Sequence, residues 1–107
     1  MLSACGFLQA LFNKPPRAVI EATPTVGEAP LRVEFDGSKS YDPDGEITSF
    51  AWDFTSDGLV DATGVTTTKV FNKPGDYVTT LTVIDNLRAT ATASVKIEAI
   101  SVEPKEP

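Results

Sequence analysis

Residues 31–54 read LRVEFDGSKSYDPDGEITSFAWDF, and this stretch decides the fold. Apolar and charged side chains alternate from Leu31 to Asp36, which predicts a strand with one buried face. The sequence DPDG at residues 42–45 is a tight turn, because proline fixes φ near the turn value and glycine supplies a positive φ. A second strand is expected around residues 48–54, with Trp52 as its core anchor.

The same period of two continues on both sides of this stretch. Ala18, Ile20 and Ala22 alternate with more polar residues upstream, and residues 24–30 are rich in turn formers. Downstream strands are expected over residues 66–71, 77–85 and 89–98. Roughly seven short strands at spacings of about 8 to 12 residues are typical of a β-sandwich.

Composition restricts the function more than the fold. A chain of 107 residues has room for one domain, and its net charge of −6 disfavours nucleic acid as a partner. There is no histidine, and Cys5 is the single cysteine, so histidine-dependent nucleophile sets, Cys/His zinc sites and an intrachain disulfide are excluded. Paired carboxylates can catalyse glycoside hydrolysis, but these carboxylates stand in turn-like contexts. We therefore expect that the chain is not an enzyme.

Two separated motifs resemble the signature of PKD domains. The first is DGSKSYDPDGEITSFAWDF at residues 36–54, and the second is FNKPGDYVTTLTVID at residues 71–85. The resemblance covers residues 17–100 and implies an immunoglobulin-like, seven-stranded antiparallel β-sandwich without catalytic activity. Such domains serve secreted or surface proteins as spacers, adhesion modules and accessory binding units, and some bind calcium. The family often continues its Trp-Asp-Phe run with Gly-Asp-Gly, whereas residues 55–58 here read TSDG, with one residue added.

Acidic residues gather between positions 36 and 61, where Lys39 is the one cation. One hypothesis places calcium in a loop, because Asp53, Asp57 and Asp61 correspond to positions 1, 5 and 9 of a calcium-binding loop. Thr55, Gly58 and the Leu59 carbonyl fill positions 3, 6 and 7. Position 12 should be a bidentate glutamate, and here it is Gly64, so a tight site is not expected.

A second hypothesis joins residues that lie far apart in the chain. Asp42 and Asp44 of the turn would meet Asp85 at the end of the long strand, with backbone oxygens near Arg17 completing the shell. The resemblance implies the same region, because calcium-binding members place their ligands there. The alternative is that Asp42, Asp44, Asp53 and Asp85 cap turns through hydrogen bonds to nearby amides. Both interpretations stay open.

The N-terminal segment, residues 1–16, differs from the rest in its period. Residues 3–13 predict a short amphipathic helix, which Pro15 and Pro16 would end. The helix presents an apolar stripe that includes Phe7, Leu8, Leu11 and Phe12. Because an exposed stripe invites association, one hypothesis is a self-associating subunit of a surface filament or of a particle-surface (decoration) assembly.

A competing hypothesis starts from Cys5. The sequence LSACG at residues 2–6 resembles a bacterial lipobox, whose cysteine is lipidated, although no charged and apolar regions precede it here. The protein would then be a lipid-anchored or secreted adhesion or spacer module, and only lipidation would bring it to a membrane. Residues 101–107 are expected to form a flexible tail. Either hypothesis places the chain outside the cell or on a cell or particle surface.

The long strands also predict one uniform outer surface. Val78, Thr80, Thr82 and Ile84 share a face, and residues 90–94 would extend it with Thr90, Thr92 and Ser94. Flat faces rich in threonine occur in carbohydrate-binding and adhesion modules, but β-propensity explains threonine there equally well.

Overall fold

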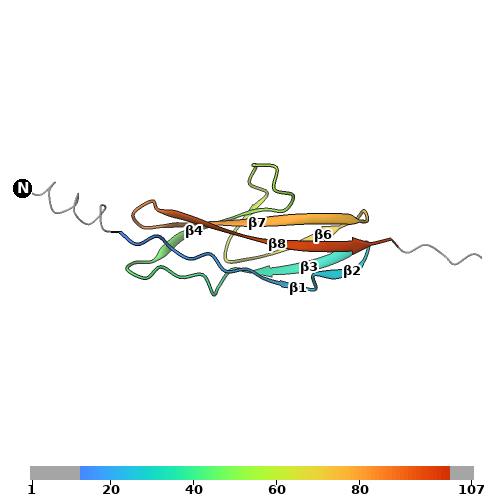
Figure 1. Cartoon of the computed structure of the whole chain (residues 1–107), viewed down its shortest axis with the longest axis horizontal. Helices are drawn as coiled ribbons and strands as arrows, with labels where there is room; N and C mark the ends of the chain where they lie inside the picture. Colours follow the sequence, from blue (N-terminus) through green and yellow to red (C-terminus); the bar gives the residue numbers. More distant parts are fainter. Residues whose placement is uncertain (1–12, 102–107) are drawn as a thin grey trace, which may run out of the picture.

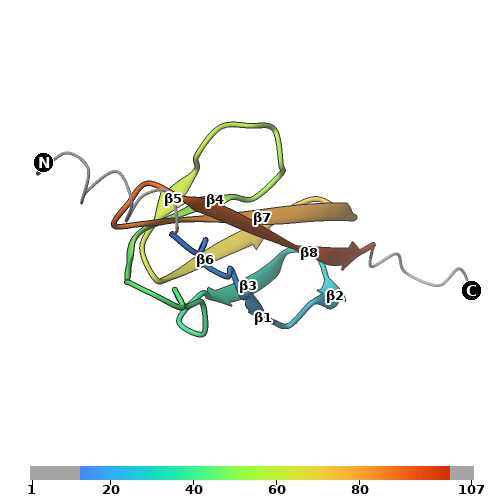
Figure 2. The same cartoon turned by 60° about the vertical axis from the view of Figure 1, so that its left-hand side comes forward.

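The chain folds into two stacked β-sheets, as Figures 1 and 2 show. The computed structural model describes residues 13–101. A three-stranded sheet has the order β1-β3-β6, and a five-stranded sheet has the order β2-β8-β7-β4-β5. In chain order the strands are β1 (Glu21–Thr23), β2 (Val26–Glu28), β3 (Leu31–Asp36), β4 (Ile47–Asp53), β5 (Ala62–Thr63), β6 (Thr66–Phe71), β7 (Gly75–Asp85) and β8 (Thr90–Ile100). The prediction of an all-β sandwich is therefore confirmed.

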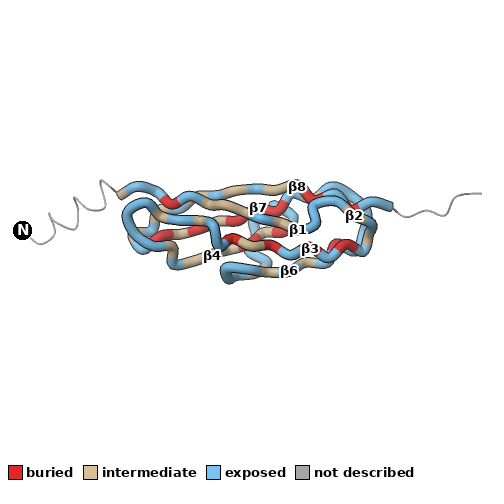
Figure 3. Tube along the Cα trace, turned by 90° about the horizontal axis from the view of Figure 1, so that it is seen from below, coloured by how far each residue is buried: buried red, intermediate tan, exposed pale blue. Residues whose placement is uncertain are grey.

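The core lies between the two sheets and follows the alternation of the sequence (Figure 3). Every second residue of β3 is buried, from Leu31 to Phe35. Trp52 is fully buried on β4, and its ring centroid lies 5.6 Å from that of Phe35. Its indole N–H donates to the carbonyl oxygen of Gly64 at 2.8 Å, so the one polar atom of the ring is satisfied. Trp52 is the core anchor that its position predicts.

Strands β7 and β8 form a long antiparallel hairpin that carries most of the five-stranded sheet. Their register runs from the Gly75–Ala99 pair to the Ile84–Thr90 pair. Leu81 and Val83 point into the core, whereas Thr80, Thr82 and Ile84 lie on the other face and are half-buried. The predicted face assignment is therefore correct along the whole hairpin.

The predicted strand count and pairing need correction. The described residues form eight strands rather than seven, because β2 and β5 have three and two residues and are too short to show a period. The turn-rich residues 24–30 contain β2, which pairs with β8 in parallel, so the sandwich is not wholly antiparallel. Ala18 and Ile20 pack against the core as predicted, but β1 begins only at Glu21.

The turn at residues 42–45 forms where it is predicted, but its glycine has a different role. Gly45 is not among the glycines with positive φ. A Cβ atom on Gly45 would lie 2.5 Å from the side-chain oxygen of Asn86, which is too close for any real contact. A larger residue there would displace the Asn86 side chain, so glycine fits because the loop after β7 approaches closely.

Residues 1–12 and 102–107 lie outside the described part of the chain. The expected helix, its stripe of Phe7, Leu8, Leu11 and Phe12, and the candidate lipidation at Cys5 fall there and stay predictions. The described part of the chain begins at one end of the sandwich and finishes at the other (Figure 1). Within residues 13–101 we find no helix with the length and apolar character that crossing a bilayer requires.

Candidate functional site

The incoming segment, residues 13–17, is held against the loops at one end of the sandwich. Arg17 and Tyr41 exchange backbone hydrogen bonds of 2.7 and 3.0 Å. The amide of Lys14 donates to Asp44 Oδ2 at 2.8 Å. Residues 13–16 belong to the predicted apolar segment and linker, yet the contacts of Asn13 and Lys14 join them to the domain that is predicted to begin at Arg17.

Asp85 is the central carboxylate of this end. Its side chain is only 2% exposed, and Oδ1 accepts hydrogen bonds from the amides of Leu87 and Ala89 at 2.9 and 2.8 Å. Oδ2 accepts a hydrogen bond of 2.9 Å from the side-chain amide of Asn13. Burial by itself raises the pKa of Asp85, but the hydrogen bonds from Asn13, Ala89 and Leu87 outweigh it and lower the pKa. The carboxylate therefore stays charged although it is enclosed.

Asp42 approaches Asp85 from the β3–β4 connection. Its Oδ1 accepts a hydrogen bond from the amide of Asp44 at 3.1 Å. Its Oδ2 is shut off from solvent and has no hydrogen-bond partner. Burial raises the pKa of Asp42 above the ordinary 3.8 and outweighs the hydrogen bond from the Asp44 amide, which lowers it. Hydrogen bonding with the side chains of Asp44 and Asp85, and then the negative charge of Asp85, add to the increase. A buried carboxylate oxygen without a donor is costly unless the group is protonated or paired with a positive charge.

This arrangement, which we call the incoming-end site, consists of Asn13, Asp42 and Asp85, with Asp44 beside them. Calcium prefers carboxylate and amide oxygens and tolerates loose geometry, so the donor types fit calcium. The structure brings Asp42 and Asp85 together as the sequence predicts. The carbonyl of Arg17 accepts the Tyr41 amide instead of facing the site, and Asp44 Oδ2 accepts the Lys14 amide.

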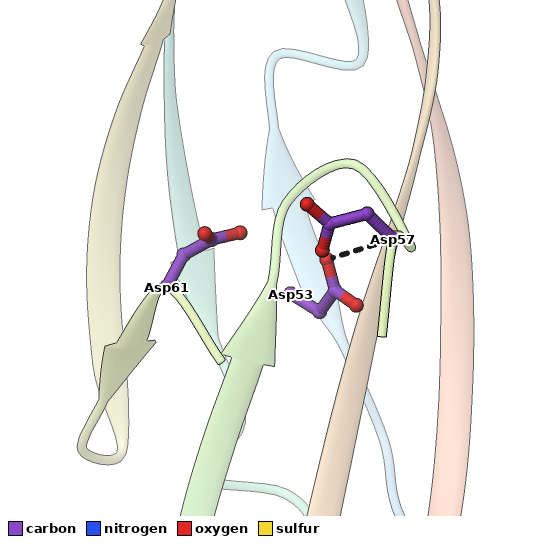
Figure 4. A group of neighbouring side chains, drawn as sticks. All are labelled: Asp53, Asp57 and Asp61. Atoms are coloured by element: carbon purple, nitrogen blue, oxygen red, sulfur yellow. Dashed lines mark hydrogen bonds between the residues drawn. The ribbon is translucent and has the colours of Figure 1, made fainter. Parts of the chain in front are cut away.

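The second acidic group, the loop cluster, consists of Asp53, Asp57 and Asp61. Figure 4 shows the three side chains facing one another across the loop after β4. Within residues 13–101 this is the one group of three metal-binding side chains whose ligand atoms all lie within 4.8 Å of one another. Asp57 and Asp61 are exposed, and Asp53 is half-buried.

The carboxylates of the loop cluster already serve the loop backbone. Asp53 accepts hydrogen bonds from the amides of Asp57 and Gly58 at 3.2 and 2.7 Å, and Asp61 accepts one from Phe54 at 2.8 Å. Burial raises the pKa of Asp53, but the hydrogen bonds from Gly58 and Asp57 prevail and lower it. These contacts are those of turn-capping aspartates.

The outer face of the five-stranded sheet carries the predicted row of hydroxyl groups. Thr80 Oγ1 lies 2.7 Å from Ser56 Oγ and 3.0 Å from Ser94 Oγ, and the register places Thr82 opposite Thr92. The loop after β4 overhangs this face and leaves a groove of about 410 Å³. Its lining consists of Ala51, Trp52, Asp53, Ser56, Gly58, Leu59, Val60, Thr80, Thr82 and Ile84.

Sequence reasoning missed Asn13 as a site residue. It lies 72 positions from Asp85, at the predicted end of a helix, and an isolated asparagine carries no pattern. By contrast, Asp42 and Asp85 could be predicted as site residues, because Asp42 stands in a recognisable turn sequence at residues 42–45 and Asp85 ends a recognisable strand.

Comparison with known proteins gives the family and its relatives. A profile of the PKD domain matches residues 13–99. The chain is 40% identical over 94 residues to "Collagenase ColA" of Clostridium perfringens (strain 13 / Type A), covering 88% of this chain and 8% of that protein. It is 38% identical over 90 residues to "Microbial collagenase" of Vibrio alginolyticus, covering 82% and 11%. The chain thus spans a small part of these relatives.

Solved structures show the same fold. The PKD1 domain of the Vibrio cholerae metalloprotease PrtV has a TM-score of 0.68 at 32% identity, and the match covers 81% of this chain and 99% of that one. A structure of carbohydrate-binding modules from the β-sandwich superfamily, described in terms of promiscuous specificity, has a TM-score of 0.74 at 33% identity. That match covers 83% of this chain and 36% of that one.

Proposed function

The chain belongs to the PKD-domain family, and on this basis we propose that it is a non-catalytic spacer and binding module of an extracellular protein, stiffened by calcium where the chain enters. The observation that carries the proposal is the incoming-end site, where Asp42 Oδ2 is buried without a donor. The curated relatives are collagenases of which the matched part is 8% and 11%, which is consistent with an accessory role.

The position of the site supports a role as a spacer. The chain enters at one end of the sandwich and leaves at the other (Figure 1). Contacts of Lys14 and Arg17 hold the incoming segment to the connection between β3 and β4, and the contact of Asn13 holds it to the end of β7. A cation bound there would fix the direction in which the preceding residues leave the domain.

Calcium would remove the electrostatic cost of this end. Burial is the main reason why the pKa of Asp42 is raised, and the neighbouring side chains of Asp44 and Asp85 add to the increase, so this end of the domain disfavours a second charged carboxylate. Calcium accepts about 6 to 8 oxygen ligands, so Asp42 and Asp85 could share it with backbone oxygens and water. Asn13 now donates its N–H to Asp85, and a turn of its amide would offer the oxygen instead.

Hydrogen exchange followed by NMR tests this proposal. Adding calcium to the full chain is expected to slow exchange of the Lys14 and Arg17 amides at least severalfold, because the incoming segment opens less often. Asp42→Asn should abolish the slowing, and Asp57→Asn, which changes the same charge in the loop cluster, should preserve it. Unchanged exchange at both amides in the unmodified protein contradicts the proposal.

A second candidate function is recognition of neutral glycans on the outer face. It is favoured by the hydroxyl row beside the groove and by similarity to the structure of carbohydrate-binding modules. Thr82→Val keeps the shape and the β-propensity but removes one hydroxyl group. If glycans bind there, calorimetry with soluble polysaccharides should show weaker binding for this variant than for Thr66→Val on the other sheet. Equal binding, or none, contradicts this candidate.

The assembly function predicted from the N-terminal segment rests on residues outside the described part. Deleting residues 1–14 should convert an assembled form into monomers if Phe7, Leu8, Leu11 and Phe12 hold subunits together, which size measurement in solution reports. Because this deletion also removes Asn13, deleting residues 1–12 is the matched control for the domain itself. Mass spectrometry at Cys5 reports lipidation.

A further inference from the structure

The two sheets have four edge strands, and three of them are very short. β1 and β2 have three residues each, and β5 has two. β6, which has six residues, is the fourth edge, and no described strand pairs with its outer side. Figure 3 shows it along one margin of the molecule. β6 is therefore the longest of the four edge strands. Because β2 pairs only with residues 98–100 of β8, the outer side of β8 before Glu98 is also unpaired, and β6 differs from it by the pocket that lies beside it.

The backbone groups on this open edge can be assigned from the register. The amide of Gly37 donates to the Val65 carbonyl at 2.8 Å, and the ladder continues with Phe35 opposite Thr67 and Val33 opposite Lys69. In an antiparallel pair, residues alternate between hydrogen-bonded and non-bonded positions. The amides and carbonyls of Thr66, Thr68 and Val70 therefore point outward, where the added strand of a partner would find them.

A small pocket of about 250 Å³ lies beside this edge. It is lined by Thr55, Lys69, Val70, Phe71, Asn72, Lys73 and Tyr77. The ring of Tyr77 packs on that of Phe71 with centroids 4.5 Å apart, so part of its wall is apolar and rigid. Lys69 Nζ stands 5.7 Å from the centroid of the Phe54 ring.

The charge of this pocket is opposite to that of the chain. The net charge is −6, yet two lysines line this one pocket. Within residues 13–101 the ion pairs are Lys39 with Glu21 and Lys96 with Asp76, so Lys69 and Lys73 have no acidic partner there. An ammonium group beside an aromatic wall attracts a carboxylate more strongly than one in open water.

We propose that β6 accepts an extended acidic peptide segment of a partner protein as an added strand, with one carboxylate entering the pocket against Lys69 and Lys73. Alternate side chains of an added strand point toward the space between the sheets, which is where Lys69 points. A second copy of this chain is a poor occupant, because its own β6 would bring Lys69 rather than a carboxylate. This surface is independent of the incoming-end site.

The test uses two synthetic heptapeptides that alternate threonine and valine around one central residue, which is glutamate in one and glutamine in the other. With the glutamate peptide at about 1 mM, NMR should show shifts at the amides of Thr66, Thr68 and Val70, and their exchange should slow. The glutamine peptide should bind roughly tenfold more weakly, because it has no charge to place between the lysines.

Two double variants, each of which removes two lysine charges, test where the carboxylate of the peptide binds. Lys69→Gln/Lys73→Gln should abolish the preference for glutamate, whereas Lys39→Gln/Lys96→Gln should preserve it. A glutamate peptide that is N-methylated on the amides facing β6 removes donors without altering the protein, and it should bind at least tenfold more weakly. The proposal is overturned by absent shifts at the three amides, by equal affinity for the two peptides, or by self-association through β6 that excludes the peptide.

Discussion

The two acidic groups of this domain differ in how they are built. The loop cluster draws its three carboxylates from nine consecutive positions, 53 to 61, and leaves two of them exposed. The incoming-end site draws Asn13, Asp42 and Asp85 from three distant segments and encloses Asp85 almost completely. The loop cluster brings three carboxylates within 4.8 Å of one another, but the incoming-end site holds the buried carboxylate oxygen without a donor. The two groups therefore differ in whether their carboxylate oxygens already have donors, and not only in how close the acidic side chains lie.

The hydrogen bonds explain this difference. In the loop cluster the bonds to Asp53 and Asp61 come from residues within seven positions, so these carboxylates shape one loop. In the incoming-end site one bond joins residues 72 positions apart, so the carboxylate of Asp85 ties the first described residue to the end of β7. Changes at the incoming-end site should affect the whole domain, and changes at the loop cluster should stay local.

The largest expected effect comes from removing the carboxylate of Asp85. Asp85→Ala leaves the Leu87 and Ala89 amides and the Asn13 side chain without their acceptor, so Tm should fall by on the order of 10 °C. Asp61→Ala removes one such hydrogen bond, to Phe54, and should lower Tm by about a third of that. Thermal unfolding by circular dichroism measures both. Equal losses contradict the distinction between the two groups.

Calcium should distinguish the groups next. Calcium at about ten times its Kd should raise Tm of the unmodified chain by roughly 5 °C. Asp42→Asn should abolish this increase, and Asp57→Asn should leave it unchanged. The reverse outcome assigns the cation to the loop cluster, and an unchanged Tm in the unmodified chain removes both sites.

A smaller effect is expected from pH without calcium. The pKa of Asp42 is raised in the folded state, so between pH 3.8 and that higher pKa the folded state binds more protons than the unfolded state. Asp42 therefore lowers stability as pH rises through this window. Asp42→Asn should raise Tm by a few degrees at pH 7 in the presence of a chelator, and the gain should vanish near pH 3.8. A variant that is less stable than the unmodified chain at pH 7 contradicts this repulsion.

Asp85 and Asp53 have lowered pKa values, so their effect on stability changes with pH in the direction opposite to that of Asp42. For them the unfolded state binds more protons below pH 3.8, so the stability they contribute is lost as pH falls through their folded pKa values. Comparing Tm of the unmodified chain with that of Asp42→Asn across pH separates the two contributions.

The smallest effect concerns the incoming segment. Asn13→Ala removes one donor to Asp85 and should lower Tm by about 2 °C. The same donor helps to lower the pKa of Asp85, so NMR titration of that carboxyl group should show a higher pKa in the variant. An unchanged pKa would mean that the Asn13 contact does not persist in solution.

Sequence patterns predicted the sandwich where the strands are long. β3, β7 and β8 alternate without interruption, and their faces are those expected. β2 and β5 were not predicted, because two or three residues cannot show a period. Their pairing also depends on partners elsewhere in the chain. Gly45 was recognised as a turn residue, but the close approach of the Asn86 side chain, which favours glycine there, could not be predicted.

By itself, the sequence determined which side chains face the core, because a period of two divides a strand into faces regardless of its partners. It also identified the acidic turn at residues 42–45 and the carboxylate at the end of β7. Only the tertiary structure decided that Asn13, Asp42 and Asp85 meet, and that Asp42 Oδ2 is buried without a donor. The order of strands in the sheets brings these residues together. They lie in turns and near a chain end, where the sequence has no periodicity, so their contact could not be predicted from the sequence.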